Sequence, residues 1–185
     1  MNNLPCGYLL AGDEKILSQL SEGKDLVVDI GTCHGRSAAI LSQRAKRVIT
    51  IDVFEKMDLI QNIGSRTHYA ELFQNNPHYY ADVKLLLSRY PNITVVQELA
   101  NEYAARQNSE SVDLVFFDGD HSFTGLQRDF SAWYPRIKDQ GILAFHDATN
   151  DNWDVQAYCN QFLYSFEEIK FPDIPETSIR AFYKV

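Results

Sequence analysis

The sequence has few cysteines, and no segment of it resembles a leader peptide or a membrane span. Its three cysteines, Cys6, Cys33 and Cys159, are widely spaced and follow neither a zinc-binding spacing nor a disulfide framework. Their scarcity favours a reducing compartment, so we expect a cytoplasmic protein. The N-terminal residues offer no basic stretch followed by an apolar run, which argues against a signal peptide. No apolar run approaches the roughly 18 residues of a membrane-spanning helix, and no membrane partner is expected.

Positive charge is also in short supply. Lys and Arg total 17 against 25 Asp and Glu, which gives a net charge of −8. A negative field of this kind repels phosphate backbones, so nucleic acid is not expected as a partner. The chain of 185 residues is 45% apolar, which suits one globular core. We therefore expect residues 1–185 to form a single domain.

Short apolar runs rich in β-branched residues alternate with helical patterns. The expected strands are Leu26–Gly31, Arg47–Asp52, Ile93–Glu98, Val112–Asp118, Gly141–Ala148, and two more around Phe166–Phe171 and Ser178–Val185. The expected helices are Arg36–Ala45, Tyr80–Tyr90, Asn101–Gln107, Thr124–Ile137 and Trp153–Leu163. This alternation predicts an α/β fold with a Rossmann-like, doubly wound, mostly parallel seven-stranded sheet. The loop between the last two strands is too short for a crossover, so they are expected to form an antiparallel edge pair.

One long stretch, Val53–Tyr79, shows only weak periodicity and is rich in Asn, His and aromatic residues. A long irregular segment in a compact domain is usually functional or a flexible connection. We expect a substrate-side cap, with a flexible connection as the alternative. Few residues precede the first strand, so the acceptor pocket is expected to come from Val53–His78, from the C-terminal strand pair, or from a second subunit.

The first strand runs into the turn "GTCHG", in which Gly31 and Gly35 lie four residues apart before a helix. This spacing is neither the dinucleotide fingerprint nor a P-loop, so a pyrophosphate is not expected. Asp52 closes the second strand, where a carboxylate can accept hydrogen bonds from both hydroxyls of a ribose. Together these features predict a site for a nucleoside without phosphates. The alternative is a plain turn beside an exposed strand-end acid.

The fourth and fifth strands both end in groups that can carry charge. Asp118 and His121 follow "VDLVFF", and His146 and Asp147 follow "GILAF". Because carboxyl ends of adjacent parallel strands lie about 5 Å apart, these side chains should converge. His121 and His146 are candidate general bases, since imidazole titrates near neutral pH. Alternatively, His121 ties its loop to the following helix, and we expect Asp120 to pin that loop.

With these motifs in view, the chain resembles the class I S-adenosylmethionine-dependent methyltransferases. "VVDIGTCHGRSAAIL" is similar to their glycine-rich first motif and "ITID" to their ribose-binding acid. The resemblance implies that S-adenosylmethionine is the cofactor. It implies that Asp29, Gly31, Gly35 and Ser37 contact the methionine end of the cofactor, that Asp52 holds the ribose and that Asp118 lies beside the transferable methyl. Glu98 would contact the adenine region, with Leu99 or the backbone as the alternative. Asp29 has a second interpretation, a buried acid that caps backbone amides.

The block from Val112 to Asp147 resembles a bacterial subfamily of small methyltransferases with Asp-Gly-Asp-His and His-Asp after these strands. That subfamily resembles the metal-dependent O-methyltransferases of catechol type. The resemblance implies a Mg²⁺ or Mn²⁺ ion on Asp118, His146 and Asp147. The sequence departs from the catechol pattern, because Ala148 stands where an asparagine is usual and Asn150 is the nearest substitute. The metal is therefore left open.

The expected function is methyl transfer from S-adenosylmethionine to a hydroxyl oxygen of a small molecule, with or without a divalent metal. His121, Asp118 and His146 are the candidate catalytic residues. N-methylation without a metal and a non-catalytic nucleoside-binding module are the alternatives. A NAD-dependent oxidoreductase is disfavoured by the glycine spacing. The relatives implied by the resemblance often pair, so we expect a homodimer.

Overall fold

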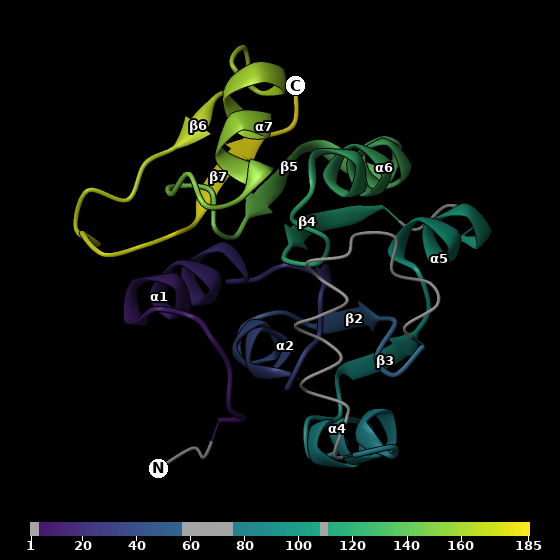
Figure 1. Ribbon diagram of the computed structural model, residues 1–185. Helices are drawn as coiled ribbons and strands as arrows, with labels where there is room; N and C mark the ends of the chain where they lie inside the picture. The colour runs from purple at the N-terminus through teal and green to yellow at the C-terminus, as the bar shows by residue number, and fades with distance from the viewer. Residues whose placement is uncertain (1–3, 57–75, 108–110) are drawn as a thin grey trace.

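The computed structural model describes residues 4–56, 76–107 and 111–185. Its strands are β1 (Leu26–Ile30), β2 (Arg47–Asp52), β3 (Ile93–Gln97), β4 (Val112–Phe117), β5 (Ile137–Phe145), β6 (Glu168–Ile169) and β7 (Arg180–Tyr183). They form one seven-stranded sheet in the order β3-β2-β1-β4-β5-β7-β6 (Figure 1). The expected sheet is therefore confirmed. Most of the expected cap lies outside the described residues.

The pairing of the strands locates the ligand-binding end of the sheet. β1 pairs in parallel with both β2 and β4, and β4 pairs in parallel with β5. β7 is antiparallel to β5 and to β6, so the antiparallel edge pair is confirmed. The chain reverses its direction across the sheet between β1 and β4. In open α/β sheets, ligands bind beyond the carboxyl ends of the strands at such a reversal.

Helices cover both faces of the sheet (Figure 1). One layer holds α1 (Ala11–Leu20), α2 (Arg36–Ser42) and α4 (Tyr79–Leu87), and the other holds α5 (Ala100–Arg106), α6 (Phe123–Trp133) and α7 (Asp154–Phe162). Alternate residues of a strand pack against the two helix layers, because successive side chains point to opposite faces of the sheet. Val27 packs in the α1–α2 layer and Val28 in the α5–α7 layer. Burial on both faces explains why the strands read as continuous apolar runs.

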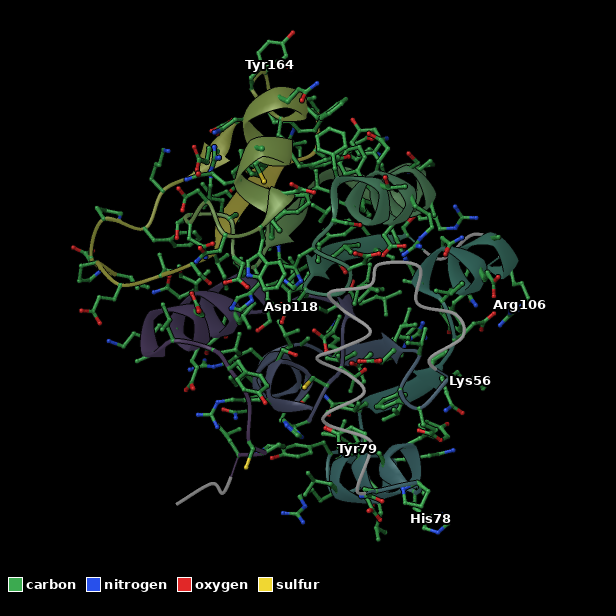
Figure 2. The ribbon with its side chains drawn as sticks, viewed as in Figure 1. Lys56, His78, Tyr79, Arg106, Asp118 and Tyr164 are labelled. Atoms are coloured by element: carbon green, nitrogen blue, oxygen red, sulfur yellow. The ribbon has the colours of Figure 1, made fainter. Side chains whose placement is uncertain are left out.

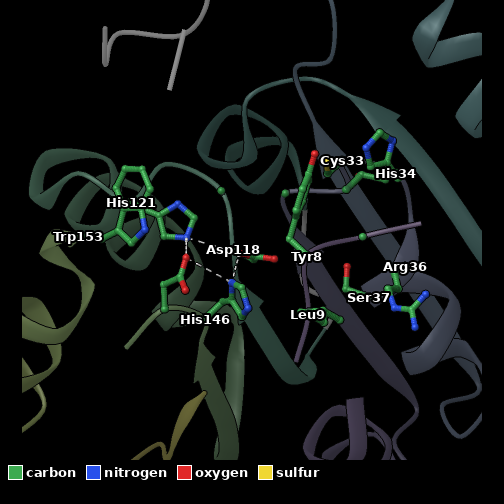
Figure 3. A pocket seen from close by; sticks show the side chains of 15 residues that line it. Tyr8, Leu9, Cys33, His34, Arg36, Ser37, Asp118, His121, His146 and Trp153 are labelled. Atoms are coloured by element: carbon green, nitrogen blue, oxygen red, sulfur yellow. Dashed lines mark ion pairs between the residues drawn. The ribbon is translucent and has the colours of Figure 1, made fainter. Parts of the chain in front are cut away.

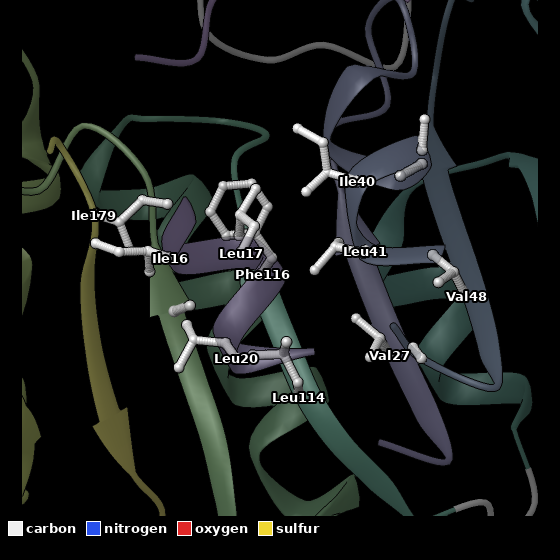
Figure 4. Close-up of a cluster of buried hydrophobic side chains, with 14 of the residues drawn as sticks. Ile16, Leu17, Leu20, Val27, Ile40, Leu41, Val48, Leu114, Phe116 and Ile179 are labelled. Atoms are coloured by element: carbon white, nitrogen blue, oxygen red, sulfur yellow. The ribbon is translucent and has the colours of Figure 1, made fainter. Parts of the chain in front are cut away.

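Helix α1 is the one helix of the described residues that the sequence analysis did not anticipate. Its segment has few apolar residues, but Ile16, Leu17 and Leu20 lie on one face and are buried against the sheet. Figure 4 shows this face beside Leu114 and Phe116 of β4. α1 therefore forms because of tertiary packing rather than because of its own propensity.

Element ends differ from expectation mainly where they meet the site. β4 ends at Phe117 and β5 at Phe145, so Asp118 and His146 lie in loops just beyond the strands. α6 is shorter than expected because Pro135 lies in a 3₁₀ turn, after which β5 begins at Ile137. None of the helices in the described part of the chain has the length and apolar character needed to cross a bilayer.

Candidate active site

A cavity of about 320 Å³ opens at the carboxyl ends of β1 and β4 (Figure 3). Four segments supply most of its wall: the N-terminal segment before α1, the glycine turn after β1, the loop after β4 and the loop after β5. Its lining residues include Tyr8, Gly31, Ser37, Asp118, His121 and His146. The expected convergence of the strand-end residues is therefore observed.

The two glycines of the turn are required by its geometry. Gly31 has φ +99°, and a Cβ there would lie 2.1 Å from the backbone oxygen of Asp118. Gly35 has φ +87° at the start of α2, and a Cβ there would meet Leu87 at 2.9 Å. Only glycine adopts such backbone positions without strain or collision. The turn therefore brings the ends of β1 and β4 close together along one wall of the cavity.

Asp29 lies beneath this turn and is fully buried. Its Oδ2 accepts hydrogen bonds from Thr50 Oγ1 at 2.6 Å and Ser37 Oγ at 3.1 Å. Its Oδ1 has no hydrogen-bond partner among the described residues. Burial raises the pKa of Asp29 to about 7, and the nearby Asp118 and Asp52 add to the rise. The partners seen are side-chain hydroxyls rather than backbone amides, and Ser37 itself lines the cavity.

Asp52 connects the end of β2 to the glycine turn. Its Oδ2 accepts from the backbone N–H of Cys33 at 2.9 Å, and its Oδ1 accepts from that of Phe54 at 2.8 Å. These two bonds fix the carboxylate at the end of β2, beside the glycine turn. The role of Asp52 in binding ribose stays a prediction.

Glu98 lies next to Asp52 but is engaged elsewhere. Its backbone N–H donates to the Asp52 carbonyl at 2.9 Å, whereas its carboxylate pairs with Arg106 of α5. Figure 2 shows Arg106 at the outer edge of the molecule and Asp118 near its centre. Glu98 does not line the cavity, and its expected contact with adenine is untested.

Backbone hydrogen bonds continue the sheet just beyond β4 and β5 and fix the positions of Asp118 and His146. The backbone N–H of Asp118 donates to the Ile30 carbonyl at 2.9 Å, and that of His146 donates to the Phe117 carbonyl at 3.1 Å. As a result, His146 Nδ1 lies 2.8 Å from Asp118 Oδ1 and 3.7 Å from Asp147 Oδ2. His121 Nε2 lies 3.5 Å from each of the same two oxygens. We call these four residues the strand-end cluster; Figure 3 shows Asp118, His121 and His146 together.

The turn after Asp118 holds His121 in place. Asp120 Oδ1 accepts from the backbone N–H of Ser122 at 3.0 Å, as expected for a residue that pins this loop. Ser122 Oγ accepts from the N–H of Gly125 and caps α6. A Cβ on Gly125 would lie 2.3 Å from Asp120, so only glycine lets the helix start so close to the loop.

Asp13 is a site residue that the sequence analysis missed. It lies on α1, is fully buried, and its Oδ2 is 3.4 Å from His146 Nε2. Burial alone would lower the pKa of His146, but Asp118, Asp13 and Asp147 outweigh it and raise the pKa to about 11. Burial would likewise raise the pKa of Asp118, yet His146 and His121 hold it below its usual range. His146 is thus a cation between carboxylates. No local signal marked Asp13, because the contact spans 133 positions of the chain (146 − 13).

The strand-end cluster contains the residues that the resemblance implies as metal ligands. The ligand atoms of Asp118, His121 and His146 all lie within 4.8 Å of one another. Asp147 adds a second carboxylate, and Asn150 Nδ2 donates to its Oδ1 at 3.3 Å. Mg²⁺ prefers a shell of oxygen atoms, but imidazole nitrogens make up half of this four-residue set. Two imidazole nitrogens suit Mg²⁺ poorly, so the Mg²⁺ or Mn²⁺ ion that the resemblance implies on Asp118, His146 and Asp147 stays a prediction. His121, expected as a base, lies among these donors.

The N-terminal segment and Trp153 form walls that the sequence analysis did not predict. Gly7, Tyr8 and Leu9 line the cavity, and Arg36 anchors this segment by donating to the Pro5 carbonyl at 2.7 Å. Trp153 packs against His121 with ring centroids 5.3 Å apart. Figure 3 shows Tyr8 and Trp153 on either side of Asp118. These walls come from segments outside Val53–His78 and the C-terminal strand pair, and the source of the acceptor pocket stays a prediction.

Comparisons with known proteins are consistent with this geometry. A family model described as "Methyltransferase domain" matches residues 28–148. A protein of Acanthamoeba polyphaga mimivirus called "Uncharacterized protein R132" is 24% identical over 143 residues, which are 76% of this chain. The match spans 59% of the length of that relative.

Solved methyltransferase structures share the fold. A calicheamicin methyltransferase aligns with a TM-score of 0.66 and 15% identity, over 92% of this chain and 76% of its own. The N-methyltransferase NodS from Bradyrhizobium japonicum aligns with a TM-score of 0.62 and 16% identity, over 92% and 93%. A putative methyltransferase from Streptococcus mutans, solved in complex with SAH, aligns with a TM-score of 0.60 and 12% identity, over 97% and 99%.

Proposed function

The chain belongs to the methyltransferase domain family, and on that premise we propose that it transfers a methyl group from S-adenosylmethionine to a hydroxyl oxygen of a small molecule. The observation that carries this proposal is the strand-end cluster, which faces the same cavity as the glycine turn. One wall of the cavity is shaped for close approach of a ligand to backbone. The other carries groups that can accept a proton.

The turn and the acids around it would hold the cofactor. Gly31 and Gly35 leave room for the methionine part, and Ser37 offers a hydroxyl beside it. Asp29 has a buried oxygen without a partner among the described residues, which a cationic ammonium group nearby would stabilise in its charged form. Asp52 would accept the ribose hydroxyls, and Glu98 would lie towards the adenine. The sulfonium methyl would then face Asp118.

Methyl transfer is a displacement at a sulfonium carbon, in which the acceptor oxygen forms a bond to the methyl as the carbon–sulfur bond breaks. The protein has to align the two groups and receive the proton of the hydroxyl. His121 is the candidate general base that accepts this proton, because it lines the cavity and its Nε2 lies 3.5 Å from carboxylate oxygens of Asp118 and Asp147. His146 is a poor base at neutral pH because its raised pKa keeps it protonated. Its role in this proposal is to hold Asp118 as a carboxylate.

The acceptor is proposed to be small and uncharged or cationic. A cavity of about 320 Å³ accommodates little beyond the methionine end of the cofactor and one ring. Tyr8 and Trp153 are exposed aromatic side chains at its walls, suited to the faces of a sugar or phenol ring. The net charge of −8 argues against a nucleic-acid acceptor.

The test is methyl transfer from methyl-labelled S-adenosylmethionine to panels of sugars, phenols and amines, with products identified by mass spectrometry. We expect an O-methylated product whose rate falls by about 100-fold or more in His121→Ala, the scale usual for a lost acid–base group. Tyr164→Ala serves as the control, because Tyr164 is exposed and does not line the cavity. Transfer only to amines would favour the N-methyltransferase alternative. Cofactor binding without transfer to any acceptor class would favour the non-catalytic module.

A further inference from the structure

Tyr79, at the start of α4, is a buried tyrosine whose hydroxyl reaches the glycine turn. The residue is 8% exposed, and its hydroxyl is hydrogen-bonded to Nδ1 of His34. His34 lies in the turn between Gly31 and Gly35 and lines the cavity. Figure 2 shows Tyr79 beside α4, and Figure 3 shows His34 on the wall beyond Tyr8. Neither Tyr79 nor His34 belongs to the cofactor contacts or to the proton transfer of the proposed function.

Packing around α4 fixes where this hydroxyl lies. The Tyr79 ring packs against Phe54 with centroids 6.3 Å apart. Phe54 is fully buried, and its N–H donates to Asp52, the acid expected to hold the ribose. Further along α4, Leu87 fills the space beside Gly35, where a Cβ would lie 2.9 Å from it. α4 is therefore packed closely against the turn, and the fold rather than a ligand sets the position of the Tyr79 hydroxyl.

The hydrogen bond between Tyr79 and His34 has a preferred direction. Burial raises the pKa of the Tyr79 hydroxyl above its ordinary value and the pKa of the Cys33 thiol to about 12, so both groups keep their protons at neutral pH. The Cys33 thiol also hydrogen-bonds to Tyr79. Sulfur is a weak acceptor, whereas the unprotonated nitrogen of a neutral imidazole is an ordinary one. The Tyr79 hydroxyl therefore donates to His34 Nδ1, and the single ring proton of the neutral imidazole lies on Nε2.

Tyr8 contacts the same imidazole from the N-terminal segment. Its ring centroid lies 6.0 Å from that of His34, and the Tyr79 ring meets His34 edge-on at 5.6 Å. Two aromatic rings and the bond to the hydroxyl therefore hold the imidazole in one orientation at the cavity wall. An N–H donor there suits an oxygen atom of a ligand. S-adenosylmethionine offers two kinds, the carboxylate of its methionine part and the hydroxyls of its ribose.

We propose that Tyr79 is a positioning residue for the cofactor, which holds His34 as the Nε2–H tautomer so that this N–H donates to an oxygen of S-adenosylmethionine. The inference rests on the proposed function for the identity of the ligand. Within the described part of the chain, no residue of α4 lines the cavity, so Tyr79 acts through His34. α4 thereby takes part in cofactor binding without contacting the cofactor.

The tautomer is measured first, in the protein without ligand. Two-bond ¹H–¹⁵N correlation spectra of ¹⁵N-labelled protein at about pH 8, above the ordinary pKa of histidine, distinguish Nδ1–H from Nε2–H. His34→Ala identifies the His34 signals among those of the 5 histidines. We expect Nε2–H in the wild type, with an Nδ1 signal that shifts in Tyr79→Phe because it loses its donor. An Nδ1–H tautomer in the wild type would overturn the inference whether or not Tyr79→Phe folds.

Calorimetric titration with SAH measures the consequence for the cofactor. Tyr79→Phe keeps the ring and should weaken SAH binding by about threefold to tenfold, the range for one hydrogen bond of ordinary strength. Tyr80→Phe is the matched control and should bind SAH as the wild type does, because Tyr80 lies next on α4 and packs against the same Phe54. His34→Ala should weaken binding at least as much as Tyr79→Phe. Combining the two substitutions should cause no further loss, since Tyr79 acts through His34.

The same titrations with methylthioadenosine, which lacks the amino-acid part of the cofactor, identify the oxygen. A loss confined to SAH assigns the carboxylate, and an equal loss with both ligands assigns the ribose; either result supports the inference. Equal SAH affinity of the wild type and Tyr79→Phe would overturn the inference and leave the proposed function standing, as would additive losses in the double variant. Absence of SAH binding by the wild type would overturn the proposed function together with the inference.

Discussion

Replacing Asp13 with Asn should destabilise the protein, because this buried carboxylate joins three separate parts of the fold. It accepts hydrogen bonds from the Leu10 N–H at 2.9 Å, from Thr177 Oγ1 at 2.7 Å and from the Ser178 N–H at 2.7 Å. It also faces His146 at the end of β5. An Asn side chain keeps the shape but loses the charge, and one of its two acceptor positions becomes an NH₂ group.

The size of the effect follows from the titration of the carboxylate. Burial raises the pKa of Asp13, but His146, Thr177 and the backbone N–H groups of Leu10 and Ser178 together lower it from 3.8 to about 2. That difference corresponds to about 2 kcal/mol of stability at neutral pH. This figure already includes the hydrogen bond from the Leu10 N–H, so we expect Asp13→Asn to lose about 2 kcal/mol at pH 7.

The dependence on pH has a definite sign. Because the folded-state pKa is lowered, the stabilisation is present above the unfolded pKa near 4 and is lost as pH falls towards 2. Urea denaturation between pH 7 and pH 3, in EDTA, measures both variants. The matched control is Asp25→Asn, since Asp25 is a largely exposed carboxylate paired with Lys46 and should change stability by less than about 1 kcal/mol. An Asp13→Asn protein as stable as the Asp25→Asn control at pH 7 would refute the reasoning.

Three further predictions concern two residues that line the cavity and Asp29, which lies beneath the glycine turn. Gly31→Ala should fold poorly or lose cofactor affinity, because its Cβ would lie 2.1 Å from the Asp118 backbone oxygen; Gly23→Ala, also at positive φ but with nothing within 4 Å, is the control for melting temperature and binding. The pKa of Asp29 is raised to about 7, so the wild-type protein should lose stability as pH rises from about 4 to about 7. The free energy of unfolding of Asp29→Asn should not show this loss in denaturation curves. The same dependence of unfolding free energy on pH in both proteins would contradict the prediction. Trp153→Ala should raise the KM for the acceptor without changing calorimetric affinity for the cofactor, because Trp153 lies against His121 at the cavity wall; a weaker cofactor affinity with unchanged KM would contradict this.

Local patterns were sufficient to predict the sheet and the residues at its carboxyl ends. Apolar runs such as Leu26–Ile30 are buried on both faces, and that burial requires helices on either side. Gly31, Gly35, Asp52 at the end of β2 and Asp118 just after β4 are each marked by their position at the end of a strand. Their approach to one another then follows from parallel pairing, because register brings the strand ends together.

The residues that were missed depend on contacts between distant parts of the chain. α1 carries only a narrow apolar face, and its position is fixed by the close approach of Gly12 to Glu176, where a Cβ would lie 1.8 Å from the carbonyl oxygen. The sequence pattern of α1 and that of the loop around Glu176 give no indication of this contact. Asp13 and Tyr8 enter the site only because α1 packs there. The raised pKa of His146 is due first to Asp118, whose approach was expected, and then to Asp13, whose contribution no local pattern could show.

The central claim, that the glycine turn and Asp52 bind S-adenosylmethionine, is tested most directly by calorimetric titration with its demethylated product SAH. We predict one SAH bound per chain, no binding of NAD under the same conditions, and a loss of affinity of about tenfold or more in Asp52→Asn, the scale of about 1.4 kcal/mol for hydrogen bonds to a charged group. Binding of NAD without SAH, or equal SAH affinity in wild type and Asp52→Asn, would contradict the account.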